Sequence, residues 1–348
     1  MIFYSANRYS LCRIDIEVKC SVELRQEQRK RVEIMTRKKS EKTSNVQTRF
    51  LRKEIWRHRE LYLFLLPGMI ALIIFSYGPM YGIVTAFQDV KFGRGYGMND
   101  WVGLYHFKRF FNSTWFKTIM VNTISVSFLR QIFTWPLPII MALLLHNCTS
   151  KGIKKTAQMT SYLPHLLSTV VVVSIINLFC AGDFGLINIV LRNAGMERIS
   201  FFGEPGWVYP LYIISDIWKD TGYSAVVYMG ALSSVDEELM EASKIDGASK
   251  LQGIWHIQLP CIIPTIVTMF IMSMGNLFAM GADKMLLLQT DLNISASEII
   301  STYVYKVGIM QTQYGFSAAV GLFQNIINVT LLLTVNWICK KKLDTSII

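Results

Sequence analysis

The sequence predicts an all-α membrane protein with six transmembrane helices, and two observations support this fold class. The chain has 348 residues, of which 52% are hydrophobic and only 17% charged, whereas soluble domains carry about 25% charged residues. Four long segments contain no Asp, Glu, Lys or Arg at all, namely 61–88, 156–182, 251–282 and 307–339. Because about 18 uncharged, mostly apolar residues are enough to cross the hydrocarbon core as a helix, we expect several crossings.

The six spans are expected at 61–83, 119–145, 162–180, 207–231, 262–281 and 316–339. The first contains proline and glycine, which transmembrane helices tolerate where neighbours satisfy the freed backbone groups. The second contains Arg130 and the sequence WPLP at 135–138. The fourth contains Asp216, Lys219 and Asp220. These charges either form an ion pair within the helix near the outer membrane surface, or belong to a polar translocation route.

The distribution of Lys and Arg predicts that both termini lie in the cytoplasm. With that orientation the cytoplasmic segments hold 24 basic residues, and the outer loops 88–118, 181–206 and 282–315 hold nine. The first 60 residues carry 16 Lys or Arg against eight Asp or Glu. We interpret this leader as a cytoplasmic anchor beside the first span, because it contains no base-stacking motif that would indicate nucleic-acid binding.

Four parts of the chain follow from this pattern. Residues 1–60 form the basic leader, residues 61–117 the first helix with its outer loop, residues 118–339 the main membrane domain and residues 340–348 a cytoplasmic tail. Met35 begins an ordinary basic leader by itself, so we expect residues 1–34 to be dispensable or to reflect a misplaced translation start.

The loop between the fourth and fifth spans, residues 233–260, is polar but patterned like two short helices. Ser234 with Glu237 fits a capping box at the start of the first helix. Apolar residues then recur at helical spacing, and Gly247 is expected to end the helix in a turn.

A second short helix is expected over 248–258, ended by Leu259 and Pro260. We expect the apolar side of the two helices to pack on their own bundle. The side chains expected to stay exposed are those of Glu241, Lys244 and Asp246.

Within this loop, EASKIDGASKLQGIWHIQLP at 241–260 resembles the EAA motif of binding-protein-dependent ABC importer permeases, E-A-A-x3-G-x9-I-x-L-P. The matching positions are Glu241, Ala242, Gly247, Ile257, Leu259 and Pro260, with Ser243 in place of the usual second Ala. Other stretches, such as YLPHLLSTVVV and IWKDTGYSAVVYMGAL, are similar to permeases of carbohydrate importers, and most similar to the branch that handles oligosaccharides or polysaccharide breakdown products. The resemblance runs from about residue 60 to the end of the chain.

This resemblance implies a type I permease domain over 118–339, with the loop 233–260 coupling it to a separate ATPase. Glu241 would be the acidic contact to the ATPase, Gly247 the turn between the short helices, and Leu259 with Pro260 the joint to the bundle. The coupling residues it implies are Glu241, Ala242, Ser243, Asp246, Gly247, Ile257, Leu259 and Pro260.

The resemblance also implies partners, all at the cytoplasmic membrane. They are an ABC ATPase subunit, a second and related permease subunit, an extracytoplasmic solute-binding protein and an oligosaccharide substrate. ATP and Mg would bind at the partner ATPase, and no cofactor or metal is expected in this chain.

Residues that contact a sugar are expected to combine aromatic faces with a few polar groups inside the spans. The candidates are Asn177, Trp218, Tyr223, Asn276, Gln324, Asn325 and Asn328. Each has an alternative role, since amides in spans often hydrogen-bond between helices and aromatic side chains often lie at the membrane surface.

Motifs for enzymatic chemistry are missing from the sequence. It contains no G-x-x-x-x-G-K-[ST] phosphate loop, no H-E-x-x-H and no G-x-S-x-G, so ATP hydrolysis is expected to belong to a partner. The six cysteines include no C-x-x-C pair and indicate neither a metal site nor a disulfide framework.

Three other functions compete with a sugar permease. An ABC permease for a non-sugar solute would share the loop, whereas a secondary transporter would use Asp216, Lys219 and Asp220 as coupling charges. A membrane assembly factor would explain the spans but not an ordered loop.

Overall fold

The computed structural model describes residues 58–91, 93 and 99–343. The basic leader, apart from its last residues, and the end of the tail therefore lie outside the described residues. The chain divides into two compact units, which meet in sequence between Met80 and Tyr81. In the described residues the only strands are β1 (Gln88–Asp89) and β2 (Asp100–Trp101), paired antiparallel with Gln88 opposite Trp101. The rest of the regular structure is helical, which confirms the all-α prediction.

The first unit contains the beginning of an apolar helix. Its elements are α2 (Arg59–Leu72), the π-helical turn η1 (Ile73–Tyr77) and α3 (Gly78–Met80). The helical stretch Arg59–Phe87 is long and apolar enough to cross a membrane, as predicted for 61–83. Pro67 lies inside α2 without ending it.

The second unit contains the remaining elements. In chain order they are η2 (Tyr81–Phe87), α4 (Tyr105–Phe111), α5 (Phe116–Thr134), α6 (Pro136–His146), α7 (Lys151–Tyr162), η3 (Leu163–Leu166), α8 (Thr169–Cys180), α9 (Leu186–Asn193), η4 (Pro205–Trp207), α10 (Val208–Leu232), α11 (Glu237–Ile245), α12 (Lys250–Gly253), η5 (Ile254–Gln258), α13 (Leu259–Gly275), α14 (Ala282–Leu288), α15 (Ile294–Ser297), α16 (Ile300–Tyr305), η6 (Lys306–Met310) and α17 (Tyr314–Leu343).

Among the described residues, four helices are long and apolar enough to cross a membrane, and one bent pair would add a fifth. The predicted span 119–145 lies inside the helical stretch Phe116–His146, which continues past Pro136 at the start of α6. α17 contains the predicted span 316–339. α10 matches 207–231 as a helix of 25 residues. Because it contains three charged residues, it is not one of the four helices that are apolar enough to cross a membrane. Six spans remain a prediction.

Two predicted spans are broken. The segment 162–180 is not one straight helix, since α7 with η3 meets α8 at 103°. Pro164 lies in η3, and the Ser168 hydroxyl accepts a hydrogen bond from the Val171 N–H and so begins α8 afresh. The segment 262–281 is helical only to Gly275.

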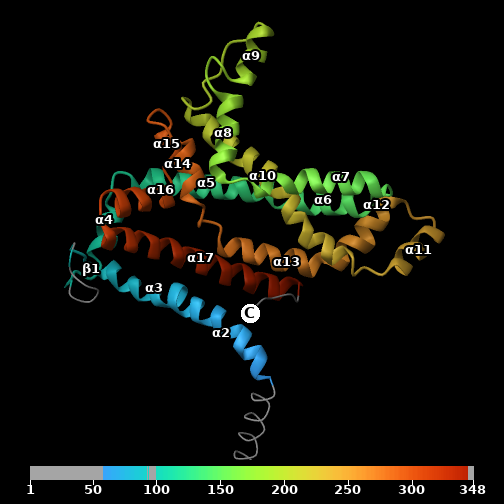
Figure 1. Ribbon diagram of the computed structural model, residues 1–348, viewed down its shortest axis with the longest axis horizontal. Coiled ribbons are helices and arrows are strands. Elements are labelled where there is room, and N and C mark those ends of the chain that lie inside the picture. The colour runs from blue at the N-terminus through green and yellow to red at the C-terminus, as the bar shows by residue number, and fades with distance from the viewer. Residues whose placement is uncertain (1–57, 92, 94–98, 344–348) are drawn as a thin grey trace, which may run out of the picture. The chain divides into compact units, whose positions relative to one another are not determined.

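The helices of the second unit pack in two groups that are visible in Figure 1. α6 and α7 lie along α10, and α13 lies along α17. Ala142, Ala225 and Leu232 are fully buried in the core between α6 and α10. Within this unit, α11 and α12 lie at the end opposite to α4 and α16 (Figure 1). The two short helices of the predicted loop are therefore grouped at one end of the bundle.

Candidate functional site

The polar loop between α10 and α13 does fold as two short helices, which we call the elbow (residues 236–258). Its first helix, α11, is capped by Asp236, whose carboxylate accepts a hydrogen bond from the Glu238 N–H at 2.9 Å. The predicted capping box with Ser234 is wrong, because the Ser234 hydroxyl donates to the Ala231 carbonyl instead. Asp236 immediately precedes α11 and has an extended backbone conformation. Its side chain can therefore accept a hydrogen bond from the first turn of the helix, as an N-cap residue does.

Gly247 forms the turn of the elbow, as predicted. The Ala248 N–H donates to the Ser243 carbonyl and the Gly247 N–H to the Lys244 carbonyl. This pair of bonds is a Schellman motif, which requires a left-handed residue at the position of Gly247. Its φ is +82°, and nothing lies within 4 Å of the place where a Cβ would stand. The requirement for glycine is therefore conformational and not steric.

The second helix begins at a capping box that was not predicted. The Ser249 hydroxyl accepts from the Gln252 N–H, and the Gln252 side chain accepts from the Ser249 N–H. Gly253 is buried where α12 meets α11, and a Cβ there would stand 3.2 Å from Cε of Met240. The two helices enclose a cleft of about 350 Å³, which includes Asp246 and Ile257 in its lining.

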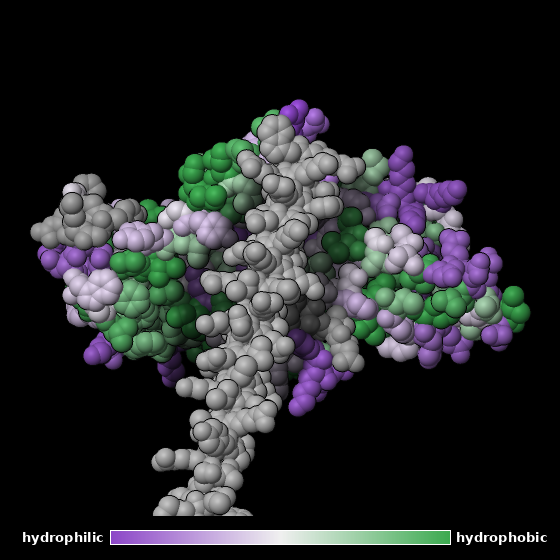
Figure 2. Space-filling view, turned by 90° about the horizontal axis from the view of Figure 1, so that it is seen from below, coloured by the Kyte–Doolittle hydropathy of each residue, from purple (hydrophilic) through white to green (hydrophobic). Residues whose placement is uncertain are grey.

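The elbow is largely exposed, which contradicts the expected packing of its apolar side on its own bundle. No residue of α11 is buried. Ile245 is 86% exposed, Leu251 77% and Trp255 67%. Glu241, Lys244 and Asp246 are exposed, as expected. A short, charged helix has too few apolar neighbours to bury itself, so these side chains stand free of the bundle. Figure 2 shows hydrophilic and hydrophobic surface side by side at the end where the elbow lies.

The joint between the elbow and the bundle is continuous. Leu259 and Pro260 do not end the second helix, because residues Lys250–Gly275 form one helical stretch. Pro260 lies in the first turn of α13, after the π-helical turn η5. A π turn shifts the hydrogen-bond register and so accommodates the missing proline N–H without a break.

A reciprocal amide pair fixes this joint. Gln258, which is buried, donates to the Asn147 side-chain oxygen at 3.0 Å and accepts from the Asn147 amide at 2.7 Å. Asn147 follows the last residue of α6. The base of the elbow is therefore attached to α6 as well as to α13, a contact that sequence spacing gave no means of finding.

The remaining motif residues fall on the elbow where the pattern places them. Ala242 and Ser243 lie on α11, and the Ser243 hydroxyl donates to the Met240 carbonyl within the helix. The departure from the usual Ala thus leaves no unsatisfied polar group. The structure brings Ser243, Asp246, Gly247 and Ile257 together around the cleft.

Comparison with known proteins identifies the family of this fold. The family described as "Binding-protein-dependent transport system inner membrane component" matches residues 135–342. The chain belongs to this family. It is thus a permease component of an ABC importer, located in the membrane.

Two curated relatives from Bacillus subtilis (strain 168) and one solved transporter are similar along most of the permease. Protein LplB is 38% identical over 82% of this chain and 90% of its own length. The polygalacturonan/rhamnogalacturonan transport system permease protein YteP is 39% identical over 82% and 89%. A chain of a bacterial ABC transporter involved in the import of the acidic polysaccharide alginate superposes with a TM-score of 0.76, at 34% identity over 84% of this chain and 99% of that chain.

In the permease, Asp216 is the centre of a charged cluster that joins three helices. Its carboxylate accepts from Arg130 Nε of α5 at 2.5 Å and also pairs with Lys284 of α14. The predicted ion pair within α10 is therefore wrong. Lys219 lies three residues away on the same helix, but Arg130 and Lys284 approach Asp216 from packed helices, and two cations satisfy the buried carboxylate better than one. Asp220 accepts from His165 at 2.9 Å.

Two of the predicted path residues satisfy the backbone where α13 breaks. Asn328 accepts from the Phe278 N–H at 3.1 Å, and Gln324 donates to the Phe278 carbonyl. Both side chains are buried and lie one turn apart on α17. Without them, non-helical backbone at 276–281 would leave polar groups unpaired in an apolar region.

The other five predicted path residues do not converge on one place. Asn177, Asn276 and Asn325 are exposed on α8, at the end of α13 and on α17. Tyr223 stacks on His165 with ring centroids 4.0 Å apart. Trp218 lies two residues before Asp220 on α10, hence about 200° around the helix from it, and is 46% exposed.

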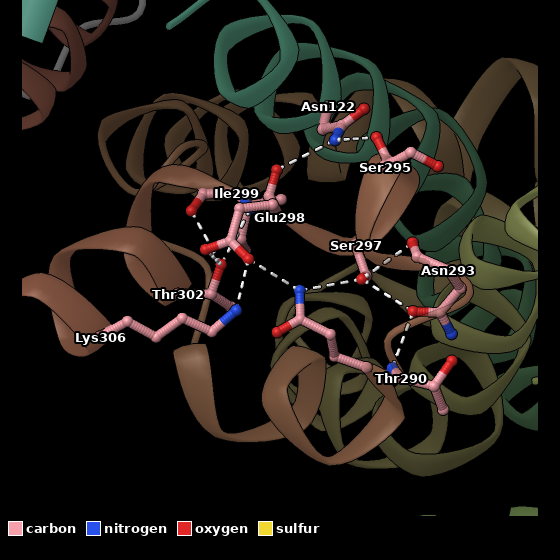
Figure 3. A network of polar contacts seen from close by, with 10 residues as sticks. Asn122, Thr290, Asn293, Ser295, Ser297, Glu298, Ile299, Thr302 and Lys306 are labelled. Carbon is pink, nitrogen blue, oxygen red and sulfur yellow. Dashed lines mark hydrogen bonds and ion pairs between the residues drawn. The ribbon is translucent and has the colours of Figure 1, made fainter. Parts of the chain in front are cut away.

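A second polar network, which the sequence did not indicate, connects α5 with the segment before α17 (Figure 3). Glu298 is buried and pairs with Lys306 at 2.5 Å, with Thr302 and Gln289 also donating to its carboxylate. Asn122 of α5 donates to the Glu298 carbonyl at 3.0 Å. These bonds attach α15 and α16 to α5 at the end away from the elbow. Among the described residues, no cluster of His, Cys, Asp or Glu could hold a metal ion.

Proposed function

We propose that this permease imports oligosaccharides or polysaccharide breakdown products, and that the elbow couples it to a separate ATPase. The observation that carries the proposal is the exposed elbow itself. A rigid turn, two capped helices and an unburied set of apolar and acidic side chains form a surface suited to another protein. The family relationship supports an ATPase as that protein, because ABC importers use ATP for transport.

In this proposal the elbow acts as a lever. ATP would close a pair of ATPase subunits, each holding an elbow, and Gly247 and the amide pair at Gln258 would keep the elbow rigid while it moves. The movement would reach the bundle through the helix Lys250–Gly275 and through α6. Glu241 would be the acidic contact to the ATPase. ATP and Mg would bind there and not in this chain.

The remaining partners and the orientation belong to the same proposal. A second permease subunit would complete the translocation path, and an extracytoplasmic binding protein would deliver the substrate. A solved relative, 33% identical with a TM-score of 0.77 over 85% of this chain and 99% of that chain, is a bacterial alginate ABC transporter in complex with alginate pentasaccharide-bound periplasmic protein. Both termini and the elbow would lie in the cytoplasm, as the distribution of Lys and Arg favours.

A sugar substrate is favoured over another solute by the relatives. The name of one curated relative includes polygalacturonan and rhamnogalacturonan, and a structural neighbour is involved in alginate import. A secondary transporter is disfavoured, because Asp216, one of its three candidate coupling charges, has both carboxylate oxygens paired with Arg130 and Lys284.

Charge reversal at Glu241 tests the coupling role. In the reconstituted importer, Glu241→Lys should lower uptake severalfold while ATP hydrolysis continues, because a cation would oppose docking on the ATPase. Glu197→Lys makes the same change at an exposed site in the outer loop and should leave both rates unchanged. Full, ATP-dependent uptake by Glu241→Lys would refute the coupling role.

A further inference from the structure

A small recess lies beside the charged cluster of the permease. It has a volume of about 90 Å³ and is lined by Arg130, Thr134, Asp216, Asp220, Thr221 and Ser224, together with one proline. Apart from that proline, every lining residue carries a polar side chain. The Thr221 hydroxyl is buried and has no hydrogen-bond partner among the described residues. A polar recess of this size admits a single carboxyl or hydroxyl group, not a sugar ring.

The groups left over in this recess include the two terminal nitrogens of Arg130, which are donors, and one oxygen of Asp220, which is an acceptor. Both oxygens of Asp216 are used, one by Arg130 and the other by Lys284. One oxygen of Asp220 is bound by His165. Arg130 offers only its Nε to Asp216, and no described residue accepts from its two terminal nitrogens. A planar guanidinium with free terminal nitrogens matches a carboxylate, which it binds with two parallel hydrogen bonds.

The position of Arg130 indicates what its free side faces. Its side chain remains 34% exposed, although it lies within the helix Phe116–His146, which is apolar enough to cross the membrane. A charged group exposed at such depth does not face lipid, because that placement is costly. It faces a water-filled path or an adjoining subunit. In the first case, substrate passing through the permease would meet this side of α5 and α10.

We propose that this recess binds the carboxylate of a uronic acid residue, and that Arg130 determines specificity for acidic over neutral oligosaccharides. The inference rests on the proposed function, since it takes the imported solute to be a saccharide. Only the carboxyl group enters the recess, while the sugar ring stays in the path. Lys284 is a positioning residue, because it holds Asp216 and thereby the guanidinium plane of Arg130.

The test compares acidic and neutral trisaccharides that differ only at the carboxyl carbon. The intact importer, reconstituted with its ATPase, second permease and binding protein, is given α-linked trigalacturonate or galactotriose, and β-linked trimannuronate or mannotriose. Wild type should import an acidic trisaccharide in preference to its neutral analogue. Arg130→Gln should lower acidic import by about tenfold or more and leave neutral import unchanged, which removes the preference.

Two further variants keep the test specific. Arg130→Lys retains the charge and the pairing with Asp216 but loses the planar fork, so acidic import should fall to an intermediate level. Arg192→Gln removes one positive charge from an exposed position on α9 and should change neither rate. Because every variant is supplied by the same binding protein, a changed ratio of acidic to neutral import reports on the permease alone.

The outcomes separate this inference from the proposed function. Equal losses of acidic and neutral import in Arg130→Gln would assign Arg130 a structural role and overturn the inference. Preferred import of the neutral trisaccharides by wild type would overturn it too, with the sugar permease intact. If wild type imports none of the four, the sugar substrate is wrong and the inference is wrong with it.

Discussion

Gly247 is the residue on which the geometry of the elbow depends most. A left-handed backbone costs a residue with a Cβ on the order of 1–2 kcal/mol, and a β-branched side chain costs more. The space around Gly247 is open. A side chain there would therefore strain the backbone of the turn, but it would not clash with a neighbouring atom.

Replacing Gly247 tests the turn, and the chain provides a close control. We expect Gly247→Val to distort the elbow and to lower uptake per ATP hydrolysed in the reconstituted importer. Gly195, with φ of +76°, ends α9 in the same motif of bonds, from Gly195 to Arg192 and from Met196 to Leu191. Gly195→Val should therefore cost similar local stability but leave coupling intact. Equal uptake per ATP in both variants would contradict a coupling role for the turn.

At the scale of single residues, the sequence predicted local features and missed distant partners. The turn at Gly247 was predictable because the motif places a glycine there and a glycine commonly ends a helix. The partners of Asp216 were not, since Arg130 is 86 residues away and Lys284 is 68. A spacing of three residues within one helix suggested Lys219 instead. The capping residue was missed because Ser234 and Asp236 both suit that role, and only the backbone direction distinguishes them.

Among the elements, the elbow and α6 are joined by Asn147 and Gln258. The two amides exchange both hydrogen bonds, and removing one of them leaves the other unpaired in a partly buried place. Such a loss costs about 1–3 kcal/mol.

A double-mutant cycle measures this coupling between elements. Asn147→Ala and Gln258→Ala should each lower the thermal stability of the purified complex and its uptake. Together they should cost clearly less than the sum of the single changes, since the second mutation finds no partner left to lose. Asn325→Ala changes an exposed residue on α17. Its effect on stability should simply add to the effect of Asn147→Ala or of Gln258→Ala. Strict additivity between positions 147 and 258 would show that the amide pair is not a joint.

Helix existence was predictable from uncharged length, whereas helix breaks were not. The segment 262–281 is apolar throughout, yet α13 ends at Gly275. The break is tolerated because Gln324 and Asn328 of α17 satisfy the backbone of Phe278. The hydropathy of a segment does not show whether another helix can satisfy its backbone groups. For the same reason it could not foresee the bend of 103° between α7 and α8.

For the whole molecule, the fold class and the family follow from patterns spread along the chain, and the comparisons confirm both. The assembly cannot be deduced in the same way. The elbow exposes Ile245, Leu251 and Trp255, and one chain alone does not explain why apolar side chains should remain in water. These exposed side chains favour a partner at this end of the bundle, and we propose that the partner is the ATPase.

The most direct test places a photo-crosslinking amino acid at residue 245, which is 86% exposed on the elbow, in cells that produce the whole importer. We expect a covalent adduct between this permease and the ATPase subunit. The same amino acid at residue 190, which is 66% exposed on α9, should give no such adduct. An assembled importer in which residue 245 crosslinks only to extracytoplasmic protein, or never to the ATPase, would contradict the proposed contact between the elbow and the ATPase.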